Sequence, residues 1–150
     1  MEEPAGRVVQ ECVEGYLFAA RPLELLLFRR PPSRGQIWVP ISGKVDPTDR
    51  DFEAALRREL REETGLDRPR RLFPLDWHPR FRADNGETWR LHAYGVEVDR
   101  SFVPALSDEH EASRWVSLPD AVALLHYEDN RAAVERLGLQ LTAASSSPKV

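Results

Sequence analysis

The chain has 150 residues, a length that fits one domain built around a single hydrophobic core. Its net charge of −4 argues against a general binder of duplex nucleic acid, which would need a basic face. The single cysteine, Cys12, excludes an intrachain disulfide and a cysteine cluster for zinc. There is no signal-peptide pattern and no long apolar run, so we expect a cytoplasmic protein without membrane contact.

The first elements predicted along the chain are strands. Residues 1–7 are acidic and aperiodic, which indicates a flexible N-terminus. Residues 8–20 have the composition of a strand, and the apolar run 23–28 suits a buried central strand. Residues 36–41 predict another strand. Its Trp38 either stacks on a nucleobase or, as is commoner for a strand tryptophan, fills the core.

A basic loop joins the second and third of these strands. It carries Arg29, Arg30 and Arg34, and guanidinium groups can make bidentate contacts to a polyphosphate. The alternative for each arginine is an ordinary solvated loop position.

A helix is predicted between Asp51 and Gly65. Asp51 is a preferred N-cap residue and is followed by good helix formers, whereas Gly65 can take the left-handed conformation that closes a helix. At about 100° per residue the apolar stripe of this helix consists of Phe52, Leu56 and Leu60.

Three carboxylates lie beside or within the buried edge of this helix: Glu59, Glu62 and Glu63. Like charges four residues apart repel each other, and acids are unfavourable near the negative end of the helix dipole. A hard divalent cation such as Mg²⁺ would resolve the conflict, because it binds carboxylates together with substrate phosphates. The alternative is a surface helix whose arginines pair with these glutamates.

The second half begins with residues 70–81, which we predict as an irregular or edge strand because they contain Pro74 and Pro79. Residues 84–87 are a hairpin turn signal, and residues 88–98 form the clearest strand of this half. On this strand His92 is either a phosphate or base contact or a satisfied strand histidine.

Two helices are predicted near the end of the chain. The first spans 118–125, with Pro119 in its first turn, and the second spans 129–137 and is stopped by Gly138. Residues 139–150 are small and polar, so we expect a disordered tail.

Residues 58–66 (R-E-L-R-E-E-T-G-L) match the second half of the Nudix box, G-x5-E-x7-R-E-U-x-E-E-x-G-U, without a mismatch. The first half departs twice. Asp49 stands where the box has Glu, and eight residues instead of seven separate it from Arg58. The extra residue lies either in the loop 47–51, which we favour, or in a π-bulge near residues 55–58. The chain therefore resembles the Nudix hydrolases.

The resemblance implies the Nudix fold, a mixed β-sheet sandwiched between α-helices of the α+β or α/β class, in one domain over residues 8–138. It also implies hydrolysis of a nucleoside diphosphate linked to another moiety, with Mg²⁺ as cofactor and Mn²⁺ able to replace it. The metal ligands it implies are Gly43, Glu59, Glu62, Glu63 and Glu109. The catalytic residues are Glu59, Glu62, Glu109 and Arg58, of which the arginine orients the acids.

The choice of Glu109 comes from residues 109–115, which resemble the Glu-His-x4-Trp signature found downstream of the box in several Nudix branches. There the glutamate supplies a loop carboxylate to the metal or the attacking water, a role for which Glu111 competes. The predicted substrate-binding residues are Arg29, Arg30, Arg34, Lys44, Trp38 and His92.

The substrate class follows from the same signature. The downstream signature resembles that of the Nudix branch that removes pyrophosphate from dATP or dihydroneopterin triphosphate. It also resembles that of the bis(5′-nucleosyl)-tetraphosphate hydrolases. We predict a (d)NTP pyrophosphohydrolase that releases a nucleoside monophosphate and pyrophosphate, with diadenosine polyphosphate hydrolysis as the alternative. The predicted partner is a nucleotide, without duplex nucleic acid or membrane, and a homodimer is compatible with the sequence.

Two other classes of protein share this scaffold. A Nudix-type isomerase of isopentenyl diphosphate would be expected to carry a catalytic cysteine, and Cys12 lies in the wrong part of the chain. A non-catalytic nucleotide sensor normally has an eroded box, and here only Asp49 and the extra residue favour it.

Overall fold

The structure is a computed structural model that describes residue 4 and residues 6–146. Its strands are β1 (Val8–Ala20), β2 (Leu23–Arg29), β3 (Trp38–Val39), β4 (Ile41–Lys44), β5 (Arg71–Pro74), β6 (Arg80–Arg82), β7 (Thr88–Glu97) and β8 (Ala112–Val116). Its helices are α1 (Phe52–Thr64), α2 (Leu118–Leu124) and α3 (Glu128–Ser146), with a short 3₁₀ turn η1 (Pro32–Arg34). None of the helices in these residues combines the length and the apolar character needed to cross a membrane.

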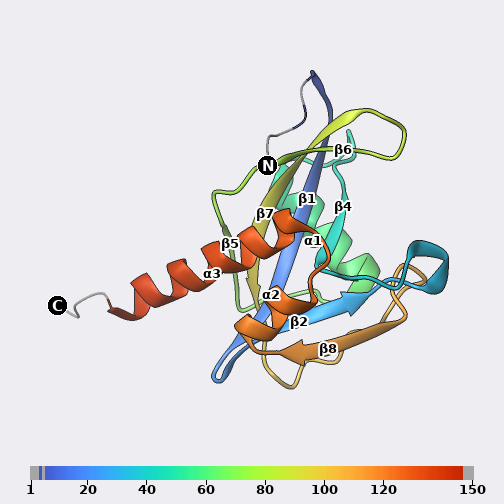
Figure 1. Ribbon diagram of the computed structural model, residues 1–150. Helices are drawn as coiled ribbons and strands as arrows, with labels where there is room; N and C mark the ends of the chain where they lie inside the picture. Colours follow the sequence, from blue (N-terminus) through green and yellow to red (C-terminus); the bar gives the residue numbers. More distant parts are fainter. Residues whose placement is uncertain (1–3, 5, 147–150) are drawn as a thin grey trace.

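The long strand β1 organises a mixed sheet. One edge of β1 runs parallel to β7, and the other edge is shared by two antiparallel partners. On this shared edge Cys12 to Gly15 pair with β4, and Leu17 to Ala20 pair with β2. The strand order is β3-β2-β1-β7-β5. In addition, β6 pairs with β7 and β8 pairs with β2. The strands β2 and β4 thus pair with successive parts of the same edge of β1. Strand β4 lies against α1, which follows it in the chain (Figure 1).

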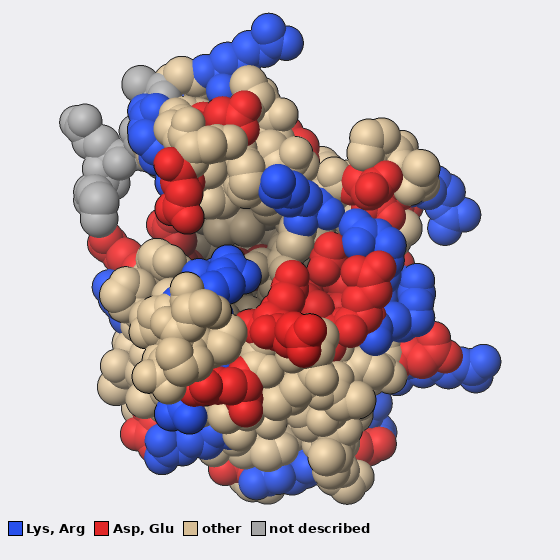
Figure 2. Space-filling model, turned by 90° about the vertical axis from the view of Figure 1, so that its right-hand side faces the viewer, with Lys and Arg blue, Asp and Glu red and all other residues tan. Residues whose placement is uncertain are grey.

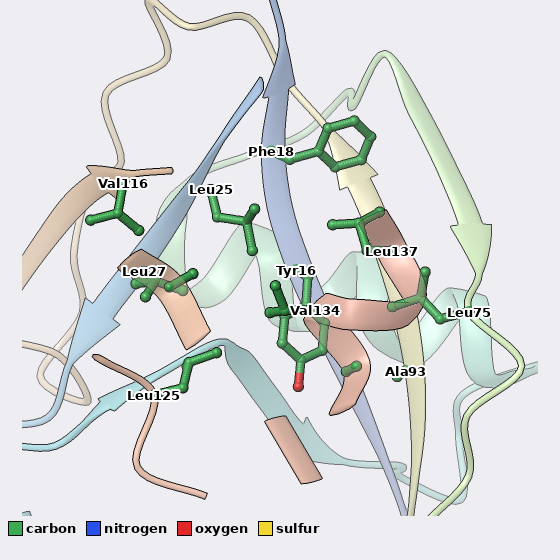
Figure 3. Packing of buried hydrophobic residues seen from close by; sticks show 12 residues of the cluster. Tyr16, Phe18, Leu25, Leu27, Leu75, Ala93, Val116, Leu125, Val134 and Leu137 are labelled. Atoms are coloured by element: carbon green, nitrogen blue, oxygen red, sulfur yellow. The ribbon is translucent and has the colours of Figure 1, made fainter. Parts of the chain in front are cut away.

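Helices cover both faces of this sheet, as predicted. Helix α1 lies behind it, and α2 and α3 lie in front (Figure 1). Alternate residues of β1 serve the two cores: Tyr16 and Phe18 pack with α2 and α3, whereas Val13 and Leu17 pack with α1. Figure 3 shows the first of these cores, in which Val134 and Leu137 of α3 lie against the sheet.

Most of the predicted elements are present at the predicted places. The strands at 8–20 and 88–97, the turn at 84–87 and the helix that begins after Asp51 are confirmed. The single strand predicted over 36–41 is wrong, because Pro40 divides it into β3, which pairs with β2, and β4, which pairs with β1. Strand β8, antiparallel to β2, was not predicted.

The predicted end of the last helix at Gly138 is also wrong. Helix α3 continues through Gly138 to Ser146. Leu137 is fully buried and Leu141, one turn later, still packs against the same core, so this face keeps the helix docked. Gly138 allows the close approach of Leu118, because an added Cβ would lie 3.0 Å from its Cδ2 atom. The predicted tail is therefore helical to residue 146, and its last residues, 147–150, lie outside the described residues. Of the predicted flexible N-terminus, residues 1–3 and 5 lie outside as well.

Docking of α3 can be tested with two leucines of the same helix. Replacing Leu137, which is fully buried, by Ala should lower the free energy of unfolding by about 2–5 kcal/mol, because it leaves a cavity in the core. Leu139→Ala is the matched control, since this side chain is 72% exposed and its loss should change stability by no more than about 0.5 kcal/mol. Urea unfolding measures both. Equal effects of the two substitutions would show that α3 does not pack as described.

Candidate active site

A pocket of about 860 Å³ opens on the side of the sheet that faces α3. The strand register places its floor residues on one face, since Cys12 pairs with both Lys44 and Leu91, and Glu14 pairs with Ser42. Its walls come from η1, the β6–β7 hairpin, the loop before β8 and the start of α3. Figure 2 shows the hollow with a continuous acidic patch beside it and basic side chains at its rim.

Helix α1 carries the carboxylates to this pocket. The Asp51 side chain accepts a hydrogen bond from the Ala54 amide at its start, and Gly65 closes it in the left-handed conformation. It is α-helical throughout, so the extra residue of the box lies in the preceding loop, as favoured. That loop is closed on itself, because the Asp46 amide donates to Asp49 and the Thr48 amide donates to Asp46.

Arg58 connects the loop, strand β4 and the acids of α1. Its Nε and Nη2 atoms donate to the two carboxylate oxygens of Asp49 at 3.1 and 2.8 Å. Its Nη1 atom donates to Glu59 at 2.8 Å, and Nη2 also donates to the Lys44 carbonyl at 3.1 Å. These hydrogen bonds from Arg58 lower the pKa of Asp49. Asp49 thus reaches Arg58 bidentately although its side chain is one methylene shorter than the Glu of the box.

The Glu59 carboxylate lies directly over the backbone of Gly43. A Cβ atom added to Gly43 would overlap the carboxylate, so only glycine permits this approach. Burial raises the pKa of Glu59, while its hydrogen bond to Arg58 opposes the rise. The arrangement brings a carboxylate and the backbone of β4 to one place, and both supply the oxygen ligands that hard divalent cations prefer.

Glu63 is a buried carboxylate without a cationic partner in contact. Neither of its oxygens has a hydrogen-bond partner among the described residues, and the nearest ring nitrogen, Nδ1 of His110, is 4.0 Å away. Its pKa is raised, first by burial and then by the neighbouring carboxyl groups of Glu109 and Glu59. Such a group is expensive to bury, and a bound cation would supply the missing partner.

The chemistry of this donor set therefore fits a divalent metal ion. Among the described residues, no three His, Cys, Asp or Glu side chains already stand in a metal-binding arrangement. Glu59 is engaged by Arg58 instead, so the carboxylates would have to close around an ion.

Of the predicted site residues, seven line the pocket: Arg30, Arg34, Gly43, Lys44, Glu59, Glu63 and Glu109. Glu62 does not line it. Its side chain is 59% exposed and lies 3.4 Å from Arg58, so the expectation that it sits at the buried edge of α1 is wrong. The reason is that Glu62 and Glu63 are neighbours in the helix and lie about 100° apart around its axis. When Glu63 is directed into the protein, Glu62 is directed to solvent.

Three predicted substrate contacts also lie outside the pocket lining. Arg29 forms a 2.7 Å ion pair with Glu111 and lies over the ring of Trp38. Trp38 itself packs against the core, which was the commoner of the two roles considered for it. His92 is stacked on Phe52 and hydrogen-bonded to Glu11. It is therefore a strand histidine with its own partners in the protein, and not a contact exposed in the pocket. Because Glu111 is held by Arg29, Glu109 is left as the loop carboxylate that faces the pocket.

Sequence reasoning missed several residues that line the pocket. They are Glu14, Phe81, Tyr127 and Asn130. His110 was noted only within its signature. It is buried against Phe28, and burial lowers its pKa to about 4. A glutamate in the otherwise apolar middle of β1 was the one available signal, because a buried acid in a strand requires a partner or a function.

Comparison with known proteins agrees with this geometry. The model of the NUDIX domain matches residues 15–137. The chain belongs to the NUDIX family. The rat bis(5′-nucleosyl)-tetraphosphatase [asymmetrical] is 32% identical over 106 residues, which cover 65% of this Nudix chain and 67% of that protein. An octanoyltransferase of Myxococcus xanthus is 34% identical over 115 residues, 75% of the chain, but the chain spans only 31% of its length.

Solved structures share the fold. A C. elegans Ap4A hydrolase in a binary complex superposes with a TM-score of 0.75 at 24% identity, over 90% of this Nudix chain and 99% of that one. The E. coli dihydroneopterin triphosphate pyrophosphohydrolase superposes with a TM-score of 0.76 at 19% identity, over 89% and 99%. The predicted family, fold and enzyme class, a Nudix-type hydrolase of pyrophosphate bonds, are confirmed.

The close approach of Glu59 to Gly43 can be tested by a double-mutant cycle. Gly43→Ala should destabilise the protein by about 1–3 kcal/mol, because the new methyl group overlaps the Glu59 carboxylate. In a Glu59→Ala background the same substitution should have a much smaller effect, since the overlapping atoms are gone. Thermal or urea unfolding of the four proteins gives the coupling. Additive effects would place Glu59 away from β4.

Proposed function

We propose that this Nudix protein hydrolyses dinucleoside tetraphosphates asymmetrically, with a divalent cation held at the end of α1. The observation that carries the proposal is one pocket that combines the carboxylates of Glu59, Glu63 and Glu109 with two cation–aromatic pairs in different parts of its lining. The Lys44 ammonium lies 4.7 Å from the centre of the Trp89 ring, and the Arg30 guanidinium lies 5.9 Å from that of Tyr127. A substrate with a nucleoside at each end of a phosphate chain needs basic groups for the chain and flat surfaces for two bases.

The residues that would hold Mg²⁺ or Mn²⁺ are Glu59, Glu63 and Glu109, with the backbone carbonyl of Gly43. The bound ion would neutralise phosphate charge and lower the pKa of a coordinated water. Arg58 fixes Glu59 and ties α1 to β4, so it acts by positioning. Glu109 is a better candidate than Glu62 to accept the proton of the attacking water, because Glu109 lines the pocket and Glu62 does not.

Relatives support the tetraphosphate over the triphosphate. Proteins named as asymmetrical bis(5′-nucleosyl)-tetraphosphatases from rat, mouse and pig are each 32% identical to this chain, whereas the dihydroneopterin triphosphate pyrophosphohydrolase supports the fold alone. The (d)NTP activity favoured from sequence stays a prediction, as do the cytoplasmic location and the homodimer. The sensor alternative is disfavoured because Asp49 still binds Arg58 bidentately.

A substrate panel tests the proposal. Purified protein is incubated with Mg²⁺ and diadenosine tetraphosphate, dATP, dihydroneopterin triphosphate or a nucleotide sugar, and the products are separated by anion exchange. We expect AMP and ATP from the tetraphosphate, at a kcat/KM well above that for the other substrates. The Glu63→Gln variant, which replaces a buried carboxyl group that would bind the proposed ion, should be inactive but folded. Pyrophosphate release from dATP alone would return the assignment to the first prediction. No products from any substrate would revive the sensor.

The two loop glutamates can be separated by substitution. Glu109→Ala should lower kcat by about 10²-fold or more, because it removes a carboxylate that faces Glu63 in the pocket. Glu111→Ala should lower kcat much less, since Glu111 pairs with Arg29 and Gln36 and does not line the pocket. Steady-state kinetics with both variants decides the role. A larger loss from Glu111→Ala would assign the loop carboxylate to that residue.

A further inference from the structure

A buried polar network on the floor of the pocket is left unexplained by the proposed chemistry. It consists of Glu14 and Tyr16 on β1 and Asn130 on the first turn of α3. Glu14 and Asn130 line the pocket although they are only 4% and 3% exposed. Among the described residues no cation lies within ion-pair distance of Glu14, so this carboxylate is not part of a salt bridge.

The donors of this network are all used within it. The Tyr16 hydroxyl donates to Oε1 of Glu14 at 2.5 Å. The Nδ2 atom of Asn130 donates to Oε2 of Glu14 at 3.1 Å and to the Tyr16 oxygen at 3.0 Å, which uses both of its hydrogens. What remains is acceptor capacity on Glu14, and the Oδ1 atom of Asn130, which is buried and has no partner among the described residues.

An unpartnered acceptor of this kind is a sign of a missing donor. Buried polar atoms in folded proteins are nearly always hydrogen-bonded, and leaving one unsatisfied is unfavourable. The network could have been completed by a neighbouring arginine or lysine, but Arg30, the basic residue on this wall, stacks on Tyr127 instead. The missing donor is therefore expected to come from a molecule that enters the pocket.

We propose that the Glu14 carboxylate accepts a hydrogen bond from the exocyclic amino group of a nucleobase and so selects bases that carry one. Tyr16 and Asn130 are the positioning residues that hold this carboxylate in place. The proposal rests on the proposed function, because it assigns one base of the nucleotide substrate to this end of the pocket. An amino group offers two hydrogens, one for Glu14 and one for the unpartnered Asn130 oxygen, which is buried and would have to be uncovered by a small movement of its side chain. A carbonyl in the same place would meet two acceptors and be rejected.

The surroundings suit a base ring. Beside Glu14 the floor is made of Cys12 and Leu91, which are small or apolar, and the exposed ring of Tyr127 stands on the wall. Apolar floor, aromatic wall and a few fixed polar atoms are the usual composition of a small-molecule site. Burial raises the pKa of Glu14, and the hydrogen bonds from Tyr16 and Asn130, which favour the ionised form, limit the rise to about 7.

Paired substrates test this reading in the intact enzyme. Diadenosine and diinosine tetraphosphates differ at position 6 of each base, which carries an amino group in adenine and a carbonyl in hypoxanthine, and at the adjoining N1, which is an acceptor in adenine and an N–H donor in hypoxanthine. We expect kcat/KM to be about ten-fold or more higher for the adenosine compound, the size of a lost hydrogen bond to a charged group. Dicytidine and diuridine tetraphosphates make the same comparison on a pyrimidine and should show the same direction.

Substitution of Glu14 then assigns the preference to this residue. In Glu14→Gln the new amide can donate to Asn130, whose own amide then turns its Nδ2 towards the pocket, so the preference for the amino base should fall about ten-fold. Asn130→Ser is the second variant and should reduce the preference in the same direction. Glu24→Gln is the control, because Glu24 pairs with Arg100 away from the pocket and its loss should leave the ratio unchanged.

The outcomes separate this inference from the proposed function. Hydrolysis of amino and oxo substrates with equal kcat/KM, or an unchanged ratio in a folded Glu14→Gln variant, would overturn the reading of Glu14 while leaving the activity in place. If no tetraphosphate is hydrolysed, the proposed function fails, and binding of AMP against IMP measured by calorimetry still decides the inference. Tighter binding of AMP that is lost in Glu14→Gln supports it, and equal binding of the two nucleotides overturns it.

Discussion

The structure depends on a group of carboxylates held close together where α1 meets β4. Glu63 is buried without a cation in contact, and Glu59 is pressed onto the backbone of Gly43. Arg58 is the only cation whose hydrogen bonds reach this group in the described residues, and most of its donors are taken by Asp49 and the Lys44 carbonyl. Burying Glu63 without a cationic partner in contact costs stability, and such a cost is typical of a functional site.

The sheet explains why this cluster opens into a substrate pocket. One edge of β1 pairs partly with β4 and partly with β2. Successive residues of β4 face opposite faces of the sheet. Gly43 faces α1 and its acids, while Ser42 and Lys44 face the pocket floor. One short strand therefore joins the proposed metal site to the surface that would hold the phosphates and the bases.

Much of this could be predicted from local sequence. The limits of α1 follow from Asp51 and Gly65, whose roles as caps depend only on their immediate neighbours. Gly138 misled the prediction because the same residue type ends helices and permits close helix packing, and only the contact with Leu118 separates the two. The sequence signature selects Glu109 over Glu111, but the ion pair that holds Glu111 on Arg29 could not be foreseen from it.

The pocket itself was the least predictable part. Glu14 and Asn130 are 116 residues apart and meet only because α3 packs across β1. Tertiary contacts of this kind leave no periodic pattern, so Glu14 could be noticed only as an acid among apolar strand residues, and nothing in the sequence connects it to Asn130. Lys44 and Trp89 come together through the pairing of β1 with β4 and β7, which sequence order does not reveal.

The most direct test of the account is the position of a bound metal ion. Crystals of the protein grown with Mn²⁺ and measured near the manganese absorption edge would show the ion by its anomalous signal. We predict a peak between Glu59, Glu63 and Glu109, next to the Gly43 carbonyl, with Glu59 drawn away from Arg58. A peak elsewhere, or Mn²⁺-saturated crystals in which Glu63 stays without a ligand, would contradict the central claim.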